Sequence, residues 1–106
     1  CIIIGRVGAY CGNVYYEKDK CWISDNAISA YVKEGIDIVY AYYLLKSLHL
    51  NKRKIGTSQP LLTQEILNNI ETPIIPYFNQ IKVGKILSII DEKIYLNTEI
   101  NNNLVA

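Results

Sequence analysis

The side chains best suited to chemistry in this sequence are basic ones that cluster or lie in predicted turns. Lysine and arginine neutralise phosphate groups, so such residues are candidate contacts to a nucleic-acid backbone. For each of them an ordinary solvated loop is the open alternative. The six that meet the description are Arg6, Lys18, Lys20, Lys52, Arg53 and Lys54.

A second set of side chains offers paired hydrogen-bond donors and acceptors. Asn26, Ser58 and Gln59 fall in predicted loops and could contact base edges if those loops face one groove. Amides and hydroxyls in loops often bond to nearby backbone instead, and this alternative stays open. These three residues are the predicted base contacts.

Catalytic chemistry has weaker support. Cys21 beside Trp22 has only His49 as a possible base, and strand alternation favours a packed core pair there. Gly5, Gly8 and Gly12 lack the spacing of a nucleotide-binding loop and are expected in turns. We expect structural roles for the four aspartates, which are Asp19, Asp25, Asp37 and Asp91. No catalytic residue is predicted.

The cysteines and the net charge bear on metal binding, cellular location and partners. Three cysteines ten residues apart lack the close pairs of metal sites, so we expect buried free thiols, no metal and a cytoplasmic location. The net charge is +1, which neither attracts nor excludes DNA as a partner. No apolar run approaches the ~20 residues of a membrane helix. The sequence begins in an apolar run without methionine, and we expect a fragment of a longer polypeptide.

The elements that must position these residues change along the chain. Residues 2–4 predict a strand, 13–16 and 21–24 a hairpin around the Lys18 and Lys20 loop, and 28–33 another strand. Helical periodicity begins after Asp37, which can cap the first turn, and continues to the polar run 51–54. A short helix is expected from Thr63 to about Asn69. The fold class is therefore α+β.

The last part of the chain has a different pattern. From about residue 78 to 102 there is no proline or turn cluster, and apolar residues recur at spacings of four, three and four. This heptad pattern predicts a long helix that pairs with another helix. The predicted pairing residues are Val83, Leu87, Ile90 and Ile94. A helix that folds back on its own domain is the alternative.

Five phrases in order resemble one known family: GxxGxYCGxVYY from Gly5, WISDNA from Trp22, YAYYLLKSL from Tyr40, GTSQPLLTQEILNNIETPIIP from Gly56, and KILSIIDEKI from Lys85. The sequence is similar to specificity subunits of type I restriction-modification enzymes, through the C-terminal part of a target recognition domain (1–76) and the conserved long helix that follows (77–106). The resemblance covers nearly the whole chain.

The resemblance implies a mixed α/β recognition domain and a spacer or dimerisation helix that sets the distance to a second recognition domain. It implies sequence-specific binding of double-stranded DNA without catalysis. Modification (methyltransferase) subunits, and through them restriction subunits, are the implied partners, with a second recognition domain or a homodimer formed through the helix. S-adenosylmethionine, ATP and Mg are implied on partner subunits only.

The sequence also departs from the family pattern. The stretch before the helix keeps Pro76 and Gln80 but lacks the usual acidic residue, so helix docking could differ locally. Gly56, Gln59, Pro60 and Asp91 resemble scaffold positions of the family. Two other classes remain open: an assembly module that acts through the long helix without touching DNA, and a small enzyme, which lacks a supporting constellation.

Overall fold

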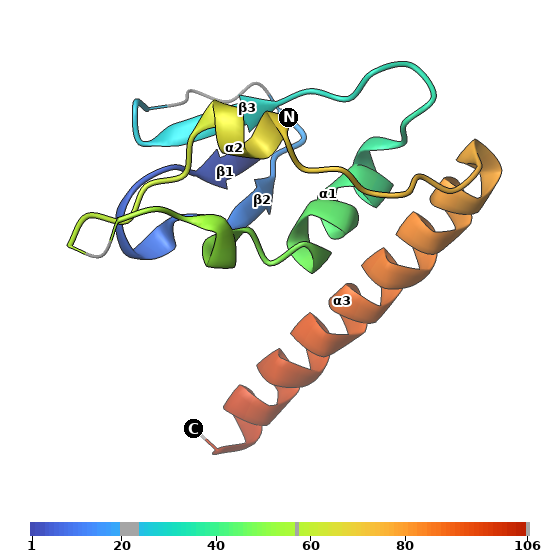
Figure 1. The fold of residues 1–106 in the computed structure, drawn as a ribbon. Helices are drawn as coiled ribbons and strands as arrows, with labels where there is room; N and C mark the ends of the chain where they lie inside the picture. The colour runs from blue at the N-terminus through green and yellow to red at the C-terminus, as the bar shows by residue number, and fades with distance from the viewer. Residues whose placement is uncertain (20–23, 57, 106) are drawn as a thin grey trace.

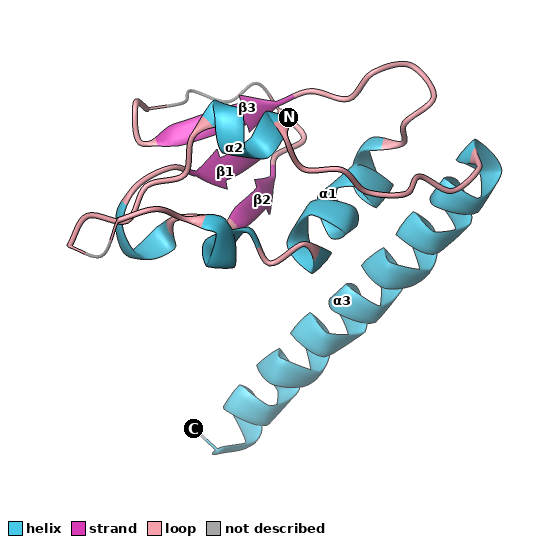
Figure 2. Ribbon diagram, in the orientation of Figure 1, coloured by secondary structure: helices cyan, strands magenta, loops and turns pink. Residues whose placement is uncertain are grey.

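The computed structural model describes residues 1–19, 24–56 and 58–105. Within these ranges the strands are β1 (Ile2–Gly5), β2 (Val14–Tyr16) and β3 (Ala27–Ala30), and the helices are α1 (Ile38–Ser47), α2 (Gln64–Asn68) and α3 (Tyr77–Val105), with the short 3₁₀ turns η1 (Gly8–Tyr10) and η2 (Leu50–Arg53). Figures 1 and 2 show a small sheet, then α1, then the long α3 that leaves the globular part. The predicted α+β fold class is confirmed.

The sheet has the order β2-β1-β3, and both neighbours of β1 are antiparallel to it. Ile2 and Ile4 alternate into the core and are 1% and 2% exposed, because successive strand residues point to opposite faces. The predicted strand 28–33 was too long at its C-terminal end. Ala30 already pairs with Ile2, the first residue of β1, so the residues after Ala30 have no strand partner.

The predicted hairpin is only partly described. Its first strand is present as β2, which pairs with β1. The positions 21–23 of the predicted second strand, and Lys20 in its loop, lie outside the described residues. Ser24 is described and belongs to no strand.

Helix α1 begins as predicted and ends earlier. The side chain of Asp37 accepts a hydrogen bond from the backbone N–H of Tyr40, which is the expected cap. The helix stops at Ser47 because His49 adopts a left-handed conformation with φ of 52°. The polar run 51–54, where the helix was predicted to end, lies beyond it, and most of this run forms η2.

Helix α2 is short, and its start was correctly predicted from one side chain. The hydroxyl of Thr63 accepts from the backbone N–H of Ile66 and caps the first turn. Leu62, directly before it, is fully buried together with Leu50 and Cys11. These three side chains belong to one core cluster, which holds the loop after β1, the turn η2 and the segment before α2 against one another.

Helix α3 packs on α1 through its first turns and then extends past the domain (Figure 1). Gly84 permits close packing, because a Cβ at this position would lie 3.3 Å from the backbone nitrogen of Tyr40. The alternative to helix pairing was a helix that folds back on its own domain, and the first part of α3 does so. The division of the chain into residues 1–76 and 77–106 stays a prediction.

Candidate nucleic-acid interface

The loops that carry most of the predicted contacts meet where β1 ends. The backbone N–H of Arg6 donates to the carbonyl of Asn26 at 2.9 Å, and the carbonyl of Arg6 accepts from the N–H of Leu62 at 2.8 Å. Arg6 is thus held on both sides by segments distant in sequence. We call this end of the sheet, formed by residues 6–13, 24–26, 51–56 and 58–62, the loop end.

The loop with the predicted base contacts Ser58 and Gln59 belongs to the loop end. The N–H of Gly8 donates to the carbonyl of Pro60, and Val7 forms a bridge with Leu61. Both predicted base contacts are exposed. Asn26, the third, is exposed as well, so all three side chains are accessible from solvent.

The densest basic cluster is attached to the same end. Lys52, Arg53 and Lys54 are exposed in and directly after η2. Asn51 fixes this turn: its amide donates to the carbonyl of Cys11 at 2.7 Å and accepts from Nζ of Lys54 at 3.3 Å. Burial raises the pKa of the Cys11 thiol, and the nearby positive charge of Lys54 opposes that rise.

The remaining predicted backbone contacts are placed differently. Lys18 is exposed but follows β2, whose last residue Tyr16 pairs with Ile2 at the opposite end of β1. Lys20 lies outside the described residues. The structure therefore brings together the loops that carry Arg6, Lys52, Arg53 and Lys54, and separates Lys18 from them.

The side chain of Arg6 borders a pocket of about 550 Å³ at the loop end. Its lining includes the exposed side chains of Ser24, Asp25 and Gln64. The Nε atom of Arg6 is buried and has no hydrogen-bond partner among the described residues. Sequence reasoning missed Asp25 and Gln64 as site residues, because only the tertiary fold brings them to Arg6.

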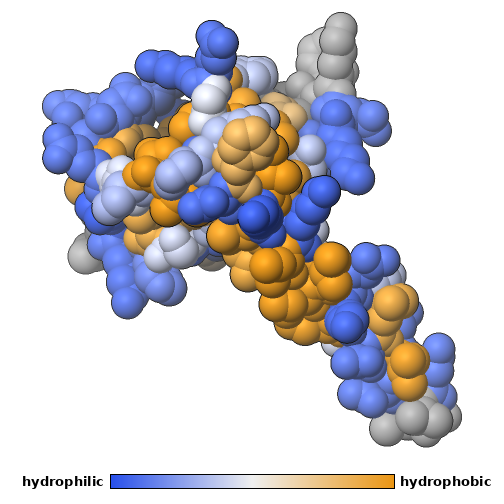
Figure 3. All heavy atoms as spheres, turned by 90° about the vertical axis from the view of Figure 1, so that its right-hand side faces the viewer, coloured by the Kyte–Doolittle hydropathy of each residue, from blue (hydrophilic) through white to orange (hydrophobic). Residues whose placement is uncertain are grey.

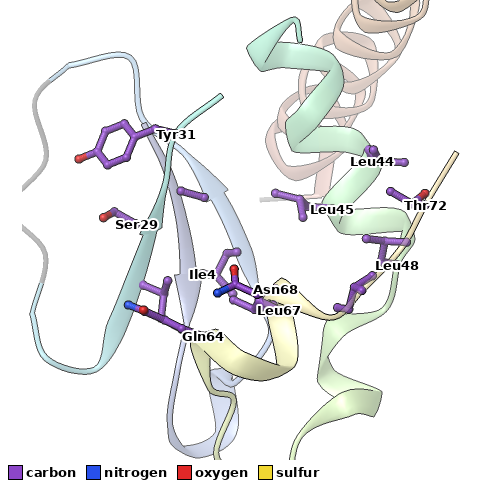
Figure 4. A pocket seen from close by; sticks show the side chains of 13 residues that line it. Ile4, Ser29, Tyr31, Leu44, Leu45, Leu48, Gln64, Leu67, Asn68 and Thr72 are labelled. Carbon is purple, nitrogen blue, oxygen red and sulfur yellow. The ribbon is translucent and has the colours of Figure 1, made fainter. Parts of the chain in front are cut away.

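A second pocket, of about 420 Å³, lies between the sheet, α1 and α2 (Figure 4). Leu44 and Leu45 of α1 and Leu48 directly after it line one side, with Leu67 and Asn68 of α2 and Tyr31 after β3 on the others. No charged side chain among the described residues lines it. This pocket therefore lacks the cationic side chains that would neutralise a phosphate.

The predicted pairing residues of α3 divide into two groups. Val83 and Leu87 are half-buried, in the part of the helix that packs on the domain. Ile90 and Ile94 are 46% and 58% exposed. Figure 3 shows apolar side chains gathered along this protruding helix. Other exposed apolar residues of α3 are Ile86, Ile89, Leu96 and Ile100.

Two residues, Gln80 and Asp91, fix α3 on the domain, and the hydrogen bonds of Gln80 were not predicted from the sequence. Gln80 is 1% exposed; its Oε1 accepts from the N–H of Asp37, while its Nε2 donates to the carbonyls of Gly35 and Ile75. The carboxylate of Asp91 accepts a 2.7 Å hydrogen bond from the hydroxyl of Tyr43. Asp91 therefore has the scaffold role expected of it.

The described residues show few features of other site types. They contain no group of three or more His, Cys, Asp or Glu that could hold a metal ion. None of the helices in the described part is both long and apolar enough to cross a membrane. Cys11 is a buried free thiol, as predicted. Cys1 is disulfide-bonded, so the expectation of a free thiol was wrong for Cys1.

These features define a small α+β domain with a basic loop end and a protruding helix that carries an unpaired apolar face. Residues 1–106 match the family model described as type I restriction modification DNA specificity domain, and the chain belongs to this family. It is 30% identical over 100 residues to the type I restriction enzyme EcoprrI specificity subunit of Escherichia coli, with 94% of this chain covered. The chain spans about a quarter of the length of that relative (25%).

Proposed function

We propose that this chain binds double-stranded DNA sequence-specifically as part of a specificity subunit of a type I restriction-modification system. The observation that carries the proposal is the gathering of Lys52, Arg53, Lys54 and the predicted base contacts at the loop end. Basic side chains there would contact phosphates and set the register, while amide and hydroxyl groups would contact bases. Family membership supports the same function.

The chain itself would catalyse no reaction. Methylation and cleavage would belong to modification and restriction subunits, which would also hold S-adenosylmethionine, ATP and Mg. This division of labour agrees with the lack of a catalytic constellation in the sequence. A cytoplasmic location follows from a DNA substrate inside the cell and is part of the proposal.

The exposed apolar face of α3 would pair with a second long helix. Ile90 and Ile94 are about half exposed, although isoleucine is among the residues most often buried. The partner helix would come from a second recognition domain or a second copy of the chain. The same face supports the second candidate function, an assembly module that does not touch DNA, since its apolar residues need a protein partner in either case.

The test of DNA binding is a triple substitution of Lys52, Arg53 and Lys54 by alanine. If each residue neutralises one phosphate, the slope of log K against log salt should flatten by about 2.7 for B-DNA. Affinity for unrelated duplexes should fall by similar factors, because phosphate contacts carry no sequence information. Binding would be measured by fluorescence anisotropy on random duplexes at several salt concentrations.

The matched control removes the same charge from α3 by replacing Lys82, Lys85 and Lys93 with alanine; all three are exposed. The control should leave the salt slope close to that of the unmodified chain. Equal slopes for both triple variants would remove the loop end from the DNA interface. A chain that retains no duplex at low salt would favour the assembly module.

A further inference from the structure

The guanidinium of Arg6 is unusual in this structure. Its Nε is buried without a hydrogen-bond partner among the described residues, although the side chain borders an open pocket. A buried donor without a partner costs free energy, more so on a charged group. Because Nε itself is buried, a ligand acceptor in the pocket would remove this cost only if the guanidinium turned toward it.

The backbone around Arg6 is fixed. Hydrogen bonds to Asn26 on one side and from Leu62 on the other hold its main chain between two segments. The start of the side chain is therefore set before any ligand arrives, and a preorganised donor loses little conformational entropy on binding. This arrangement suits a geometrically exact contact better than a loose electrostatic one.

The pocket holds both signs of charge. Asp25 lines it together with Arg6, and Ser24 and Gln64 add neutral donors and acceptors. A carboxylate repels a phosphate, so a phosphate would gain from Arg6 and lose from Asp25. A base pair instead presents acceptors and a donor side by side, which both charged groups could use at once.

We propose that this pocket recognises a G·C base pair from the major groove, with the Arg6 guanidinium donating to the guanine acceptors and the Asp25 carboxylate accepting from the cytosine amino group. Arginine to guanine N7 and O6, and aspartate to cytosine N4, are the pairings that hydrogen-bond geometry favours. The proposal rests on the proposed DNA-binding function. It reassigns Arg6 from the backbone contact expected from sequence to a base contact.

The experiment is a selection of duplexes from a random-sequence library by the full 106-residue chain. Arg6→Met keeps an unbranched apolar stem but removes the guanidinium donors, and Asp25→Ala removes the acceptor. Both variants should lose the preference for the same G·C pair by about fivefold to a hundredfold, the usual worth of one base contact. Circular dichroism would show that they stay folded.

Glu65→Ala is the matched control, because it removes another exposed carboxylate, from the first turn of α2. It should raise affinity for all duplexes slightly and leave the selected sequence unchanged. Arg6→Lys separates a base from a phosphate as the ligand, because lysine keeps the charge without the planar fork. The proposal expects the G·C preference to fall in this variant too.

Three results would overturn the proposal. An unchanged selected sequence in Arg6→Met and Asp25→Ala would show that the pocket contacts no base, while leaving the DNA-binding function intact. Equal loss for all sequences in Arg6→Met, restored by Arg6→Lys, would assign Arg6 to a phosphate. Failure of the unmodified chain to select any duplex would refute both this inference and the proposed function.

Discussion

Replacement of Gln80 by alanine should separate α3 from the domain more effectively than loss of any exposed residue. The side chain is 1% exposed and makes hydrogen bonds of 2.9, 3.2 and 2.9 Å to the Asp37 N–H and the carbonyls of Gly35 and Ile75. With about 1 kcal/mol for each bond and an added cost for partners left unpaired in the interior, the loss should be about 2–4 kcal/mol. A domain with a typical stability of about 5–15 kcal/mol would still fold.

Urea unfolding followed by circular dichroism would measure this loss, with the exposed neighbour Asn79→Ala as the control, expected within about 0.5 kcal/mol of the unmodified chain. Hydrogen exchange gives a local readout, because the Asp37 amide donates directly to Gln80 and should exchange faster once its acceptor is gone. Equal stability of Gln80→Ala and Asn79→Ala would refute the reasoning that this side chain anchors the helix.

Three further predictions follow from single contacts. Gly12→Ala should lower the free energy of unfolding more than Gly8→Ala does. Both glycines have positive φ, but only at Gly12 would an added Cβ meet backbone, 2.3 Å from the Asn51 nitrogen. Urea unfolding of both variants measures the two losses, and the reverse order would contradict this prediction. Burial and the hydrogen bond to the Asp91 carboxylate raise the pKa of Tyr43, so the stability that this shift contributes is complete below the ordinary tyrosine pKa of ~10 and is lost as the pH rises above that value. Between pH 9 and 11 the free energy of unfolding should therefore fall less in Tyr43→Phe than in the unmodified chain. Equal losses in the two proteins would contradict this prediction. Ile90→Asp should abolish helix pairing in sedimentation while Glu92→Ala leaves it intact, and unchanged assembly in the first variant would exclude Ile90 from the pairing face.

The parts of the fold that the sequence predicted well depend on local chemistry. Asp37 and Thr63 cap helices because a side-chain oxygen three residues before a free N–H needs no distant partner. The end of α1 was misplaced because nothing in the local pattern requires the left-handed conformation of His49. The end of β3 depends on where β1 begins, which is a tertiary property.

The sequence predicted which types of residue form the candidate site but not how they are arranged in space. Clustered lysines near Arg53 stand out in the sequence because charge density is a local property. The pocket at Arg6 joins residues from the loop after β1, from the segment that leads into β3 and from α2, so no spacing rule could reveal it. Gln80 was noticed only as a conserved-looking position of the family pattern, since its bond partners lie up to 45 residues away.

The geometry also explains how DNA contact and subunit assembly can be coupled in so small a domain. Helix α1 lies between the sheet and α3, so the direction of α3 depends on contacts with α1, chiefly the buried Gln80 and the close approach at Gly84. Those contacts end near Asp91, and the exposed apolar face continues beyond it. The first turns of α3 therefore fix its orientation relative to the loop end, while the later turns remain available to a partner. In the proposed function the distance between two DNA contacts would depend on this docked segment as much as on the length of the helix.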